Sequence, residues 1–340
     1  MMNLPKITIV TPTLNAALVL THCLESIRQQ NYDQDSIEII IADGGSTDST
    51  IQIAQDYNAR VIPNRLKTAE AGKLAAVRVS SGDYIALIDS DNILPTKNWI
   101  REMVGPLIAH PKAVGSEPLH YTYRASDGFI TRYCALLGMN DPLVHFLGNY
   151  DRFNLLTNTW TEVSHDEEEF ADYLIAKFDS RGVPTIGANG TVLRANFLKN
   201  AIKGDYLFDI DILADHISTN GSVTFIKVKN GIIHTYCEKS VIKFMSKQRR
   251  RVKDFLYHKS LANRDYSWDS QSKLRLLKFI VYCILFVPLL GQALIGYSRK
   301  KDYAWFFHPI ACLITLWEYG FGVLSSIFGK SEVDRSRWKQ

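Results

Sequence analysis

Two aspartates separated by one serine, Asp89-Ser90-Asp91, follow directly after the apolar run Tyr84–Ile88. Carboxylates this close repel each other and resist burial, and a divalent cation would relieve both costs. Oxygen ligands suit Mg²⁺ or Mn²⁺, which keep one or two protein carboxylates and complete their coordination with substrate phosphates. An Asp-x-Asp pattern also occurs in turns and helix caps. Its place after a buried strand and before a helix favours a cation site.

A second carboxylate, Asp43, ends the apolar run Ile37–Ala42 and is followed by Gly-Gly-Ser-Thr-Asp. The glycines would let a ligand approach the backbone, although the same residues are typical of a turn and a helix N-cap. A carboxylate at a strand tip could accept a hydrogen bond from the ring N–H of a nucleobase. A third polar stretch, IVTPTLN, places Thr11, Thr13 and Asn15 at the end of the first apolar run.

The first 115 residues alternate between continuous apolar runs and amphipathic segments. This alternation predicts an α/β fold with a mostly parallel sheet covered on both faces, similar to a Rossmann fold. Ligands bind beyond the carboxyl ends of such strands, so the three polar stretches should converge on one crevice. We predict strands at 7–11, 37–42, 60–62 and 84–88, and helices at 18–30, 48–58 (capped by Ser46 or Thr47), 69–80 and 96–109.

Residues 116–186 are rich in aromatic residues, contain an acidic cluster at Asp166–Glu169 and show no strong period. We expect this region to be irregular, helical in places, and to determine the choice of substrate. Strand signals return at Val183–Arg194 and Val223–Ile233.

The 340 residues carry a formal net charge of +4 and five scattered cysteines without metal-binding spacing. This pattern argues against a zinc site or a disulfide framework and fits a reducing compartment. No signal peptide is predicted at the N-terminus, so we expect the catalytic part to be cytoplasmic. Residues 243–264 hold eight Lys/Arg against one acid, Asp254. They predict a basic helix that rests on anionic lipid, with a solvated charged helix as the alternative.

Two apolar segments follow, Leu276–Tyr297 and Ala304–Phe328, each long enough to cross a bilayer. Basic residues lie before, between and after them, so a spanning hairpin would place a basic loop outside, against the positive-inside tendency. Prolines and glycines interrupt both segments, and Glu318 is costly in lipid. Either the hairpin violates the charge rule, or both segments dip into the cytoplasmic leaflet and return, which we favour. Two buried soluble helices are the third alternative.

The motifs IVTPTLN, ADGGSTDST and LIDSDN, in this order, resemble the nucleotide-sugar-binding half of family 2 glycosyltransferases, which are inverting enzymes with a GT-A fold. The resemblance covers residues 5–255. It continues in EAGKLAAVRVSSGDYIALIDSD, in GANGTVLR (187–194), in LFDIDILADHI (207–217), which resembles the family's Glu-Asp catalytic motif, and in IIHTY (232–236).

The resemblance implies a hexosyltransferase that uses a nucleotide-diphosphate sugar and Mn²⁺ or Mg²⁺. It implies that Asp43 binds the base, uracil or a similar ring, and that Lys73 approaches the diphosphate. The implied donor-binding residues are Thr11, Pro12, Asn15, Asp43, Lys73, Asp89 and Ser90; the implied metal ligands are Asp91, Asp89 and His234; and the implied diphosphate or acceptor residues are Asn189, Gly190, Gln248 and Arg251. His234 could instead be a surface histidine or a hydrogen-bonded core histidine.

The catalytic base is left open by the resemblance. Phe208 stands where the family usually has glutamate, and Asp209 and Asp211 are both candidates, of which we favour Asp211. An acidic helix start favoured by the helix dipole could account for either residue. Inverting transfer needs a base to activate the acceptor hydroxyl and a cation to stabilise the leaving diphosphate. The aspartates at 89 and 91 should therefore be ionised beside the metal, and the base should be free.

Processive members of the family carry Gln-x-x-Arg-Trp before their membrane helices. Gln248 and Arg251 match, but Val252 replaces the tryptophan, which favours addition of a single sugar. We therefore predict a membrane-associated glycosyltransferase at the cytoplasmic face that uses a UDP-sugar and a lipid-linked glycan acceptor for cell-surface polysaccharide or glycoconjugate synthesis. It would have no nucleic-acid partner and could form a homo-oligomer.

We predict a GT-A domain at 1–240, with a nucleotide-sugar half at 1–115 and an acceptor half at 116–240. A basic interfacial segment at 241–272 and hydrophobic segments with a basic tail at 273–340 complete the chain. A non-catalytic nucleotide-sugar-binding membrane scaffold is one alternative. A sugar nucleotidyltransferase is a weaker one, because TPTLNAALV lacks the glycine-rich phosphate loop of those enzymes.

Overall fold

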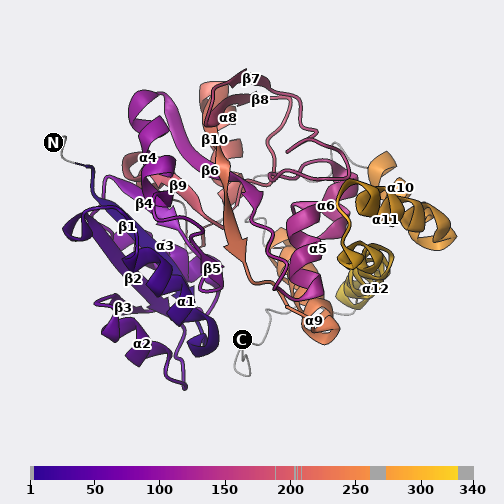
Figure 1. The fold of residues 1–340 in the computed structure, drawn as a ribbon, viewed down its shortest axis with the longest axis horizontal. Coiled ribbons are helices and arrows are strands. Elements are labelled where there is room, and N and C mark those ends of the chain that lie inside the picture. Colours follow the sequence, from indigo (N-terminus) through magenta and orange to yellow (C-terminus); the bar gives the residue numbers. More distant parts are fainter. Residues whose placement is uncertain are drawn as a thin grey trace. The chain divides into compact units, whose positions relative to one another are not determined.

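The computed structural model describes residues 4–187, 189–202, 204, 206–207, 209–260 and 273–327. The chain divides into two compact units (Figure 1). Of the described residues, those within 4–122 and 164–234 form unit 1, and those within 123–163, 235–260 and 273–327 form unit 2. This grouping differs from the predicted division at residue 240, since residues 123–163 are grouped with the C-terminal helices. The acceptor half at 116–240 stays a prediction.

Unit 1 is built on a ten-stranded sheet in the order β3-β2-β1-β4-β9-β6-β10-β8-β7, with β5 paired to β10. The pairs β3–β2, β2–β1 and β1–β4 are parallel, and β9 runs antiparallel between β4 and β6. The predicted α/β class with a mostly parallel sheet is confirmed. The strands are β1 (Ile7–Thr13), β2 (Ile37–Asp43), β3 (Arg60–Pro63), β4 (Tyr84–Leu87), β5 (Asn92–Ile93), β6 (Ala113–Tyr121), β7 (Asp166–Glu169), β8 (Tyr173–Asp179), β9 (Thr191–Arg194) and β10 (Ser222–His234).

Six helices belong to unit 1: α1 (Ala17–Arg28), α2 (Thr50–Asp56), α3 (Ala69–Val79), α4 (Trp99–Ala109), α7 (Ala195–Asn200) and α8 (Asp209–Asn220). The apolar sides of α1 and α4 join one core cluster with alternate strand residues such as Ile7 and Ile9. α3 packs on β1. α2 begins after Ser49, without a side-chain cap, so the predicted cap at Ser46 or Thr47 was wrong. Both of those residues lie in the turn that follows β2.

The expectation of an irregular region at 116–186 was wrong for its two ends. β6 carries Ser116 and Glu117 inside a buried strand, and these polar residues hide the apolar pattern. β7 is the acidic cluster, an exposed edge strand whose charges discourage pairing with another chain. The strand expected over Val183–Arg194 is shorter, because only β9 is extended within it.

Unit 2 is helical, with α5 (Phe129–Leu137), α6 (Pro142–Leu147), α9 (Val241–Ser260), α10 (Lys273–Leu285), α11 (Val287–Arg299) and α12 (His308–Ile327), the last preceded by the 3₁₀ turn η2 (Tyr303–Phe307). The predicted basic helix is α9. The first apolar segment is not one continuous helix: α10 and α11 meet at an angle of 96° at Phe286, which has φ +60°.

Among the described residues, one helix, Tyr303–Ser326, is long and apolar enough to cross a membrane; the bent α10–α11 pair would add a second only if it formed one span. Length and composition are all that this finding rests on. The end of the second predicted segment, at residue 328, and residues 261–272 lie outside the described residues.

Candidate active site

Asp43 stands at the carboxyl end of β2, directly opposite Thr13 of β1. Its Oδ1 accepts hydrogen bonds from the hydroxyls of Thr13 (2.9 Å) and Ser46 (2.5 Å), and its Oδ2 accepts from the backbone N–H groups of Gly45 and Ser46 (both 2.8 Å). Gly45 has φ +91°, which favours glycine. The carboxylate therefore orders the turn after β2 as well as standing at the strand tip.

Asn15 links the loop after β1 to the same turn. Its backbone N–H donates to the Ser46 hydroxyl (2.8 Å), and its Oδ1 accepts from the Thr47 N–H (2.9 Å). Its φ of +52° is a conformation that asparagine tolerates better than most residues. Thr11, further back on β1, is fully buried, and its hydroxyl has no hydrogen-bond partner among the described residues. These residues converge at the strand tips as predicted.

Lys73 reaches the Asp-x-Asp motif from α3. A side chain at Gly72 would lie 2.7 Å from the amide of Asn64 and 3.0 Å from Pro12 Cβ, so the glycine lets α3 lie close to β1. The Lys73 Nζ lies 3.0 Å from Asp89 Oδ1. We expected a metal and a diphosphate to neutralise both aspartates; in the structure a lysine already pairs with Asp89.

Asp91 lies beside His234, the last residue of β10. β5 pairs antiparallel with the end of β10, with Asn92 opposite His234. This pairing brings His234 Nε2 to 3.4 Å from Asp91 Oδ2. The His234 ring also contacts Tyr121, with ring centroids 5.6 Å apart. A carboxylate and an imidazole thus lie next to each other, and this donor set fits a divalent cation that takes its other ligands from a diphosphate.

Among the described residues, no group of three or more His, Cys, Asp or Glu side chains could hold a metal ion. A cation would therefore depend on substrate oxygens. The negative charges of the motif act on the nearby thiol of Cys23, whose Sγ lies 3.8 Å from the Asp89 carbonyl oxygen. Burial, and then the charges of Asp91 and Asp89, raise the pKa of this thiol, which therefore stays protonated.

Asn92 connects the motif to the loop at 187–190. It accepts from the Asp89 N–H through Oδ1 (2.9 Å) and donates to Asn189 Oδ1 (3.1 Å). Gly190 has φ +86°, and a Cβ there would lie 2.8 Å from Ile232 Cδ1. Both facts favour glycine at this position. Asn189 therefore lies next to the motif, and its implied role at the diphosphate or acceptor stays a prediction; Asn92 is a contact that the sequence did not reveal.

The sequence also gave no sign of a buried ion pair behind this loop. Glu117 of β6 and Lys227 of β10 are fully buried, with 2.5 Å between Glu117 Oε2 and Lys227 Nζ. The other carboxylate oxygen of Glu117 accepts from the Gly187 N–H (3.1 Å) and the Thr191 hydroxyl (2.9 Å). The pair thus fixes both ends of the loop that carries Asn189. Glu117 and Lys227 face each other only because β6 pairs with β10 in this register, and local sequence patterns do not predict the pairing of distant strands.

The candidate bases lie on α8. Asp211 is buried, at 7% exposure, and Asp209 begins the helix; the side chain of Asp209 lies outside the described part. Just before the helix, the Leu207 N–H donates to the Glu70 carbonyl oxygen (3.3 Å) in the first turn of α3. The start of α8 is thereby tied to the helix that carries Lys73. The choice between the two aspartates stays a prediction.

Gln248 and Arg251 belong to unit 2. Gln248 is fully buried and donates to the Asn140 carbonyl oxygen (2.8 Å), and Arg251 donates to Gln248 Oε1 (2.8 Å) and lies 3.5 Å from Asp141 Oδ2. Both side chains are therefore engaged with the loop before α6. Their implied role at the diphosphate or acceptor stays a prediction.

The family model described as glycosyl transferase family 2 matches residues 8–180, which include the strand tips after β1, β2 and β4. The chain belongs to glycosyl transferase family 2. Its resemblance to that family, drawn from the motifs, is confirmed.

Curated relatives of this family 2 chain match only in part. Glycosyltransferase GlyG of Streptococcus pneumoniae is 34% identical over 128 residues, 36% of this chain and 41% of that protein. The poly(ribitol-phosphate) beta-glucosyltransferase of Bacillus spizizenii is 31% identical over 103 residues, 28% of this chain and 16% of that protein. The chain thus spans less than half the length of these relatives.

Among solved structures, the chain resembles the mannosyltransferase PcManGT of Pyrobaculum calidifontis, solved in complex with GDP-Man and Mn²⁺. The TM-score is 0.51 at 15% identity, with 93% of this chain and 87% of that chain covered. At this identity the likeness shows the fold, which is the GT-A fold that we expected.

Proposed function

We propose that the chain is an inverting glycosyltransferase that moves a sugar from a nucleotide-diphosphate sugar, a UDP-sugar above others, to an acceptor hydroxyl. One observation carries the proposal. Asp43 ends one strand and Asp89 follows another, and both strands pair with β1; Lys73 of α3 pairs with Asp89, and His234 at the end of β10 pairs with Asp91, in a chain of glycosyl transferase family 2. Ligands of open α/β sheets bind beyond the carboxyl ends of the strands.

The donor would lie across the three strand tips. Asp43, whose two oxygens already accept four hydrogen bonds, would accept the ring N–H of the base in place of one hydroxyl donor. Thr11, whose buried hydroxyl has no partner among the described residues, lies on the neighbouring strand β1. The Lys73 ammonium would contact an oxygen of the diphosphate as well as Asp89. Asp91 and His234 would hold Mn²⁺ or Mg²⁺, which when bound supplies positive charge that stabilises the diphosphate as it leaves.

The acceptor side needs a base near the start of α8. Asp211, or Asp209 in its place, would take the proton of the acceptor hydroxyl. As that oxygen bonds to the anomeric carbon, the bond from this carbon to the diphosphate breaks on the opposite face, and the nucleoside diphosphate departs with the bonding electrons. A single displacement inverts the anomeric configuration, and no covalent enzyme intermediate is formed.

The acceptor that we propose is a membrane-held glycan, lipid-linked at the cytoplasmic face, within the synthesis of a cell-surface polysaccharide or glycoconjugate. Unit 2 supports this proposal, because its helices expose large apolar side chains and carry basic residues at their ends. The match to a poly(ribitol-phosphate) beta-glucosyltransferase also favours a cell-surface acceptor. Replacement of the family tryptophan by Val252 favours transfer of a single sugar.

The test is metal-dependent binding and transfer with a panel of UDP-, GDP-, dTDP- and CMP-sugars. Thermal stability of the detergent-purified full chain should rise with Mn²⁺ and one nucleotide class, because ligand binding to the folded state stabilises it. Asp91→Asn should lower transfer at least about 100-fold, since several kcal/mol of charge stabilisation depend on the metal. The control is Asp56→Asn, an exposed carboxylate on α2, which should leave transfer unchanged.

The outcomes separate the alternatives. Binding of a nucleotide sugar without any turnover over a range of glycan acceptors would favour the scaffold. Release of pyrophosphate from a sugar phosphate and a nucleoside triphosphate would favour the nucleotidyltransferase.

A further inference from the structure

Unit 2 exposes apolar residues in stripes along three helices. Exposed apolar residues form a stripe on α10 at Leu274, Leu277, Val281 and Ile284, on α11 at Val287, Leu290 and Leu294, and on α12 at Ile310, Leu313, Trp317, Phe321 and Leu324; Leu276, Leu285, Ile295 and Val323 are exposed outside these stripes. Within each stripe the residues recur at intervals of three or four, so they form one side of that helix. Water-facing helices carry polar residues on such a side, and a large exposed apolar surface is typical of a membrane or partner contact.

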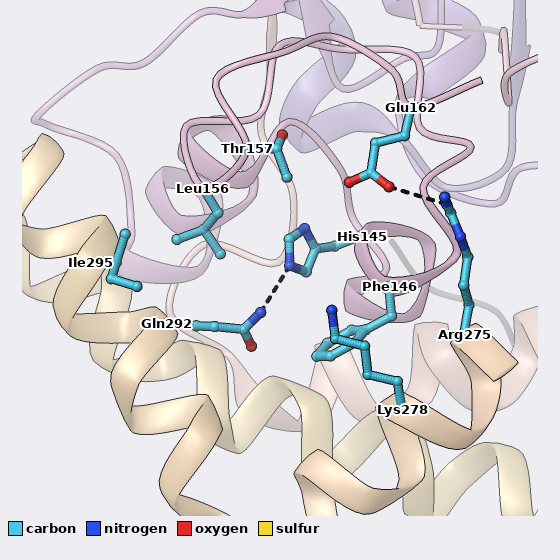
Figure 2. A pocket seen from close by; sticks show the side chains of 9 residues that line it. All are labelled: His145, Phe146, Leu156, Thr157, Glu162, Arg275, Lys278, Gln292 and Ile295. Carbon is cyan, nitrogen blue, oxygen red and sulfur yellow. Dashed lines mark hydrogen bonds and ion pairs between the residues drawn. The ribbon is translucent and has the colours of Figure 1, made fainter. Parts of the chain in front are cut away.

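Beside the stripes of α10 and α11 lies a cavity of about 340 Å³ (Figure 2). Leu156 and Ile295 line one side of the cavity, and Ile295 is half exposed on α11. Glu162 and the α10 residues Arg275 and Lys278, here called the rim, bring charge to the rest of the lining, where Phe146 lies beside Lys278. The cavity therefore combines apolar and charged groups, as a pocket for an amphiphile would.

The floor of the cavity is neutral. His145 is buried, and its Nε2 lies 3.1 Å from the side-chain amide of Gln292, while its Nδ1 lies 2.9 Å from the amide of Asn154. Burial, and then the nearby charge of Lys278, lower the pKa of His145 to about 4. The imidazole is therefore uncharged near pH 7, and the charges of the cavity belong to its rim.

On the rim, the two cations are not equivalent. Arg275 Nη1 lies 3.1 Å from Glu162 Oε2 and donates to the Leu147 carbonyl oxygen (2.5 Å), so its charge is largely matched. Lys278 follows one turn later on the same side of α10, and Figure 2 shows its ammonium directed into the cavity beside His145. Its one described partner is the ring of Tyr282, 5.4 Å from Nζ, and no described carboxylate pairs with it. The rim therefore has a net positive charge centred on Lys278.

We propose that this cavity binds the phosphate of an anionic membrane lipid. Lys278 contacts the phosphate oxygens, Thr157 and the Arg275–Glu162 pair complete the polar rim, and the acyl chain leaves along Ile295 and the apolar stripe of α11. The inference deepens the membrane part of the proposed function and does not depend on glycosyl transfer. It gives α10 two sides with separate tasks, one for the lipid interior and one for the headgroup.

The experiment is isothermal titration of the detergent-solubilised full chain with short-chain phosphatidic acid, short-chain phosphatidylcholine and inorganic phosphate. Phosphatidic acid should bind, and the other two should bind at least about tenfold more weakly, because one lacks the net charge and the other lacks the acyl chain. Lys278→Gln should weaken the binding of phosphatidic acid at least about tenfold, as loss of a charged hydrogen-bond donor would.

The matched control is Lys273→Gln, which removes one exposed lysine from the same helix outside the cavity. Binding within about twofold of the original chain is expected for this variant. Equal losses for both variants, of about fivefold each, would show diffuse attraction to surface lysines and overturn the pocket. Inorganic phosphate that binds as tightly as phosphatidic acid would overturn the lipid and leave a small-anion site.

The nucleotide-sugar stability assay, run on the same samples, separates this proposal from the proposed function. Lys278→Gln should keep the Mn²⁺-dependent shift. A chain that binds nucleotide sugar but no lipid phosphate would refute the pocket alone, and a chain that binds lipid phosphate but no nucleotide would refute the donor site alone.

Discussion

The two units place polar and apolar residues in opposite ways. In unit 1 the surface carries charged residues, as on the exposed strand β7, and large exposed apolar residues such as Leu18 and Leu66 are scattered singly. In unit 2 the outer sides of α10, α11 and α12 are apolar, while polar side chains such as Gln248 and Glu318 are buried inside. Scattered apolar residues need no explanation, but continuous stripes do. This difference is what the proposed membrane contact of unit 2 requires.

Glu318 illustrates the reversal. In the sequence it argues against placing the second apolar segment in lipid, because a carboxylate is costly there. In the structure its side chain is 1% exposed and receives two hydrogen bonds from Arg249 of α9, at 2.7 and 2.9 Å. The charge faces the interior of unit 2 and is paired. The objection therefore does not apply to the outer side of α12.

The largest effect on stability is expected at the buried ion pair of unit 1. Glu117→Gln should lower the free energy of unfolding by about 3–5 kcal/mol, because it leaves Lys227 charged and buried without its partner. Urea unfolding followed by circular dichroism gives the value.

The surface pair Glu169–Lys229 serves as its control. It joins β10 to β7 at the sheet's edge, where the Glu169 side chain is 70% exposed. Glu169→Gln should cost about 1 kcal/mol or less. Similar losses in the two variants would mean that the Glu117–Lys227 pair is effectively hydrated, and our account of the loop at 187–190 would fail.

Buried polar groups of unit 2 should respond to acid. The pKa of His145 is about 4 in the folded chain, against 6.5 for a free histidine, because burial disfavours the charged ring. Between pH 6.5 and 4, His145 therefore binds a proton in the unfolded chain but not in the folded chain. The contribution of His145 is complete above pH 6.5 and is lost as the pH falls from 6.5 towards 4, by up to about 1.4 kcal/mol per pH unit.

Stability measured between pH 4 and 8 should therefore show this slope in the original chain and a weaker slope in His145→Gln. An unchanged slope in His145→Gln would assign the acid sensitivity to other groups.

The strand-tip residues could be predicted because a local apolar run directly precedes each of them, as it does for Asp43 and Asp89. Local patterns did not give the partners: only the family resemblance placed His234 with Asp91, and the pairing of Lys227 with Glu117 was not predicted. The contacts of Asp91 with His234 and of Glu117 with Lys227 depend on the register of β10 with β5 and β6, which pairs residues far apart in the chain.

The division into units was hidden for a similar reason. Residues 123–163 show no period of their own, because aromatic residues such as Tyr133 and Tyr150 pack against the C-terminal helices. Pro288 indicated an interruption of the helix near Phe286, but the sequence did not predict the angle of 96° between α10 and α11. Local signals specify elements and strand ends, whereas packing between distant segments decides which of them form one unit.

The apolar stripes can be tested with a matched pair of leucines. Leu277→Lys on α10 should reduce binding of the full chain to lipid vesicles about tenfold, since one buried leucine contributes about 1.5–3 kcal/mol. Leu18→Lys on α1 of unit 1, where the leucine is 82% exposed, should leave vesicle binding unchanged. Vesicle flotation measures both variants. Equal losses would contradict the contrast between the units.

The smallest effect is expected at the contact between α9 and α12, where Val252 stands in place of the family's tryptophan. A Cβ at Gly322 would lie 2.7 Å from Val252 Cγ1, so the glycine of α12 is matched to a valine on α9. Gly322→Ala should lower the free energy of unfolding by about 1 kcal/mol through overpacking, and Val252→Ala in the same chain should restore part of it.

Gly320→Ala is the control on the same helix. A Cβ there meets no described atom within 4 Å, so alanine should be neutral or stabilising by up to about 1 kcal/mol. If Gly322→Ala proves as mild as Gly320→Ala, α9 and α12 are looser than the structure shows, and space for a larger residue at 252 exists. If it destabilises as expected, the close contact at Gly322 excludes tryptophan at 252, and the departure from the processive motif belongs to the helix packing itself.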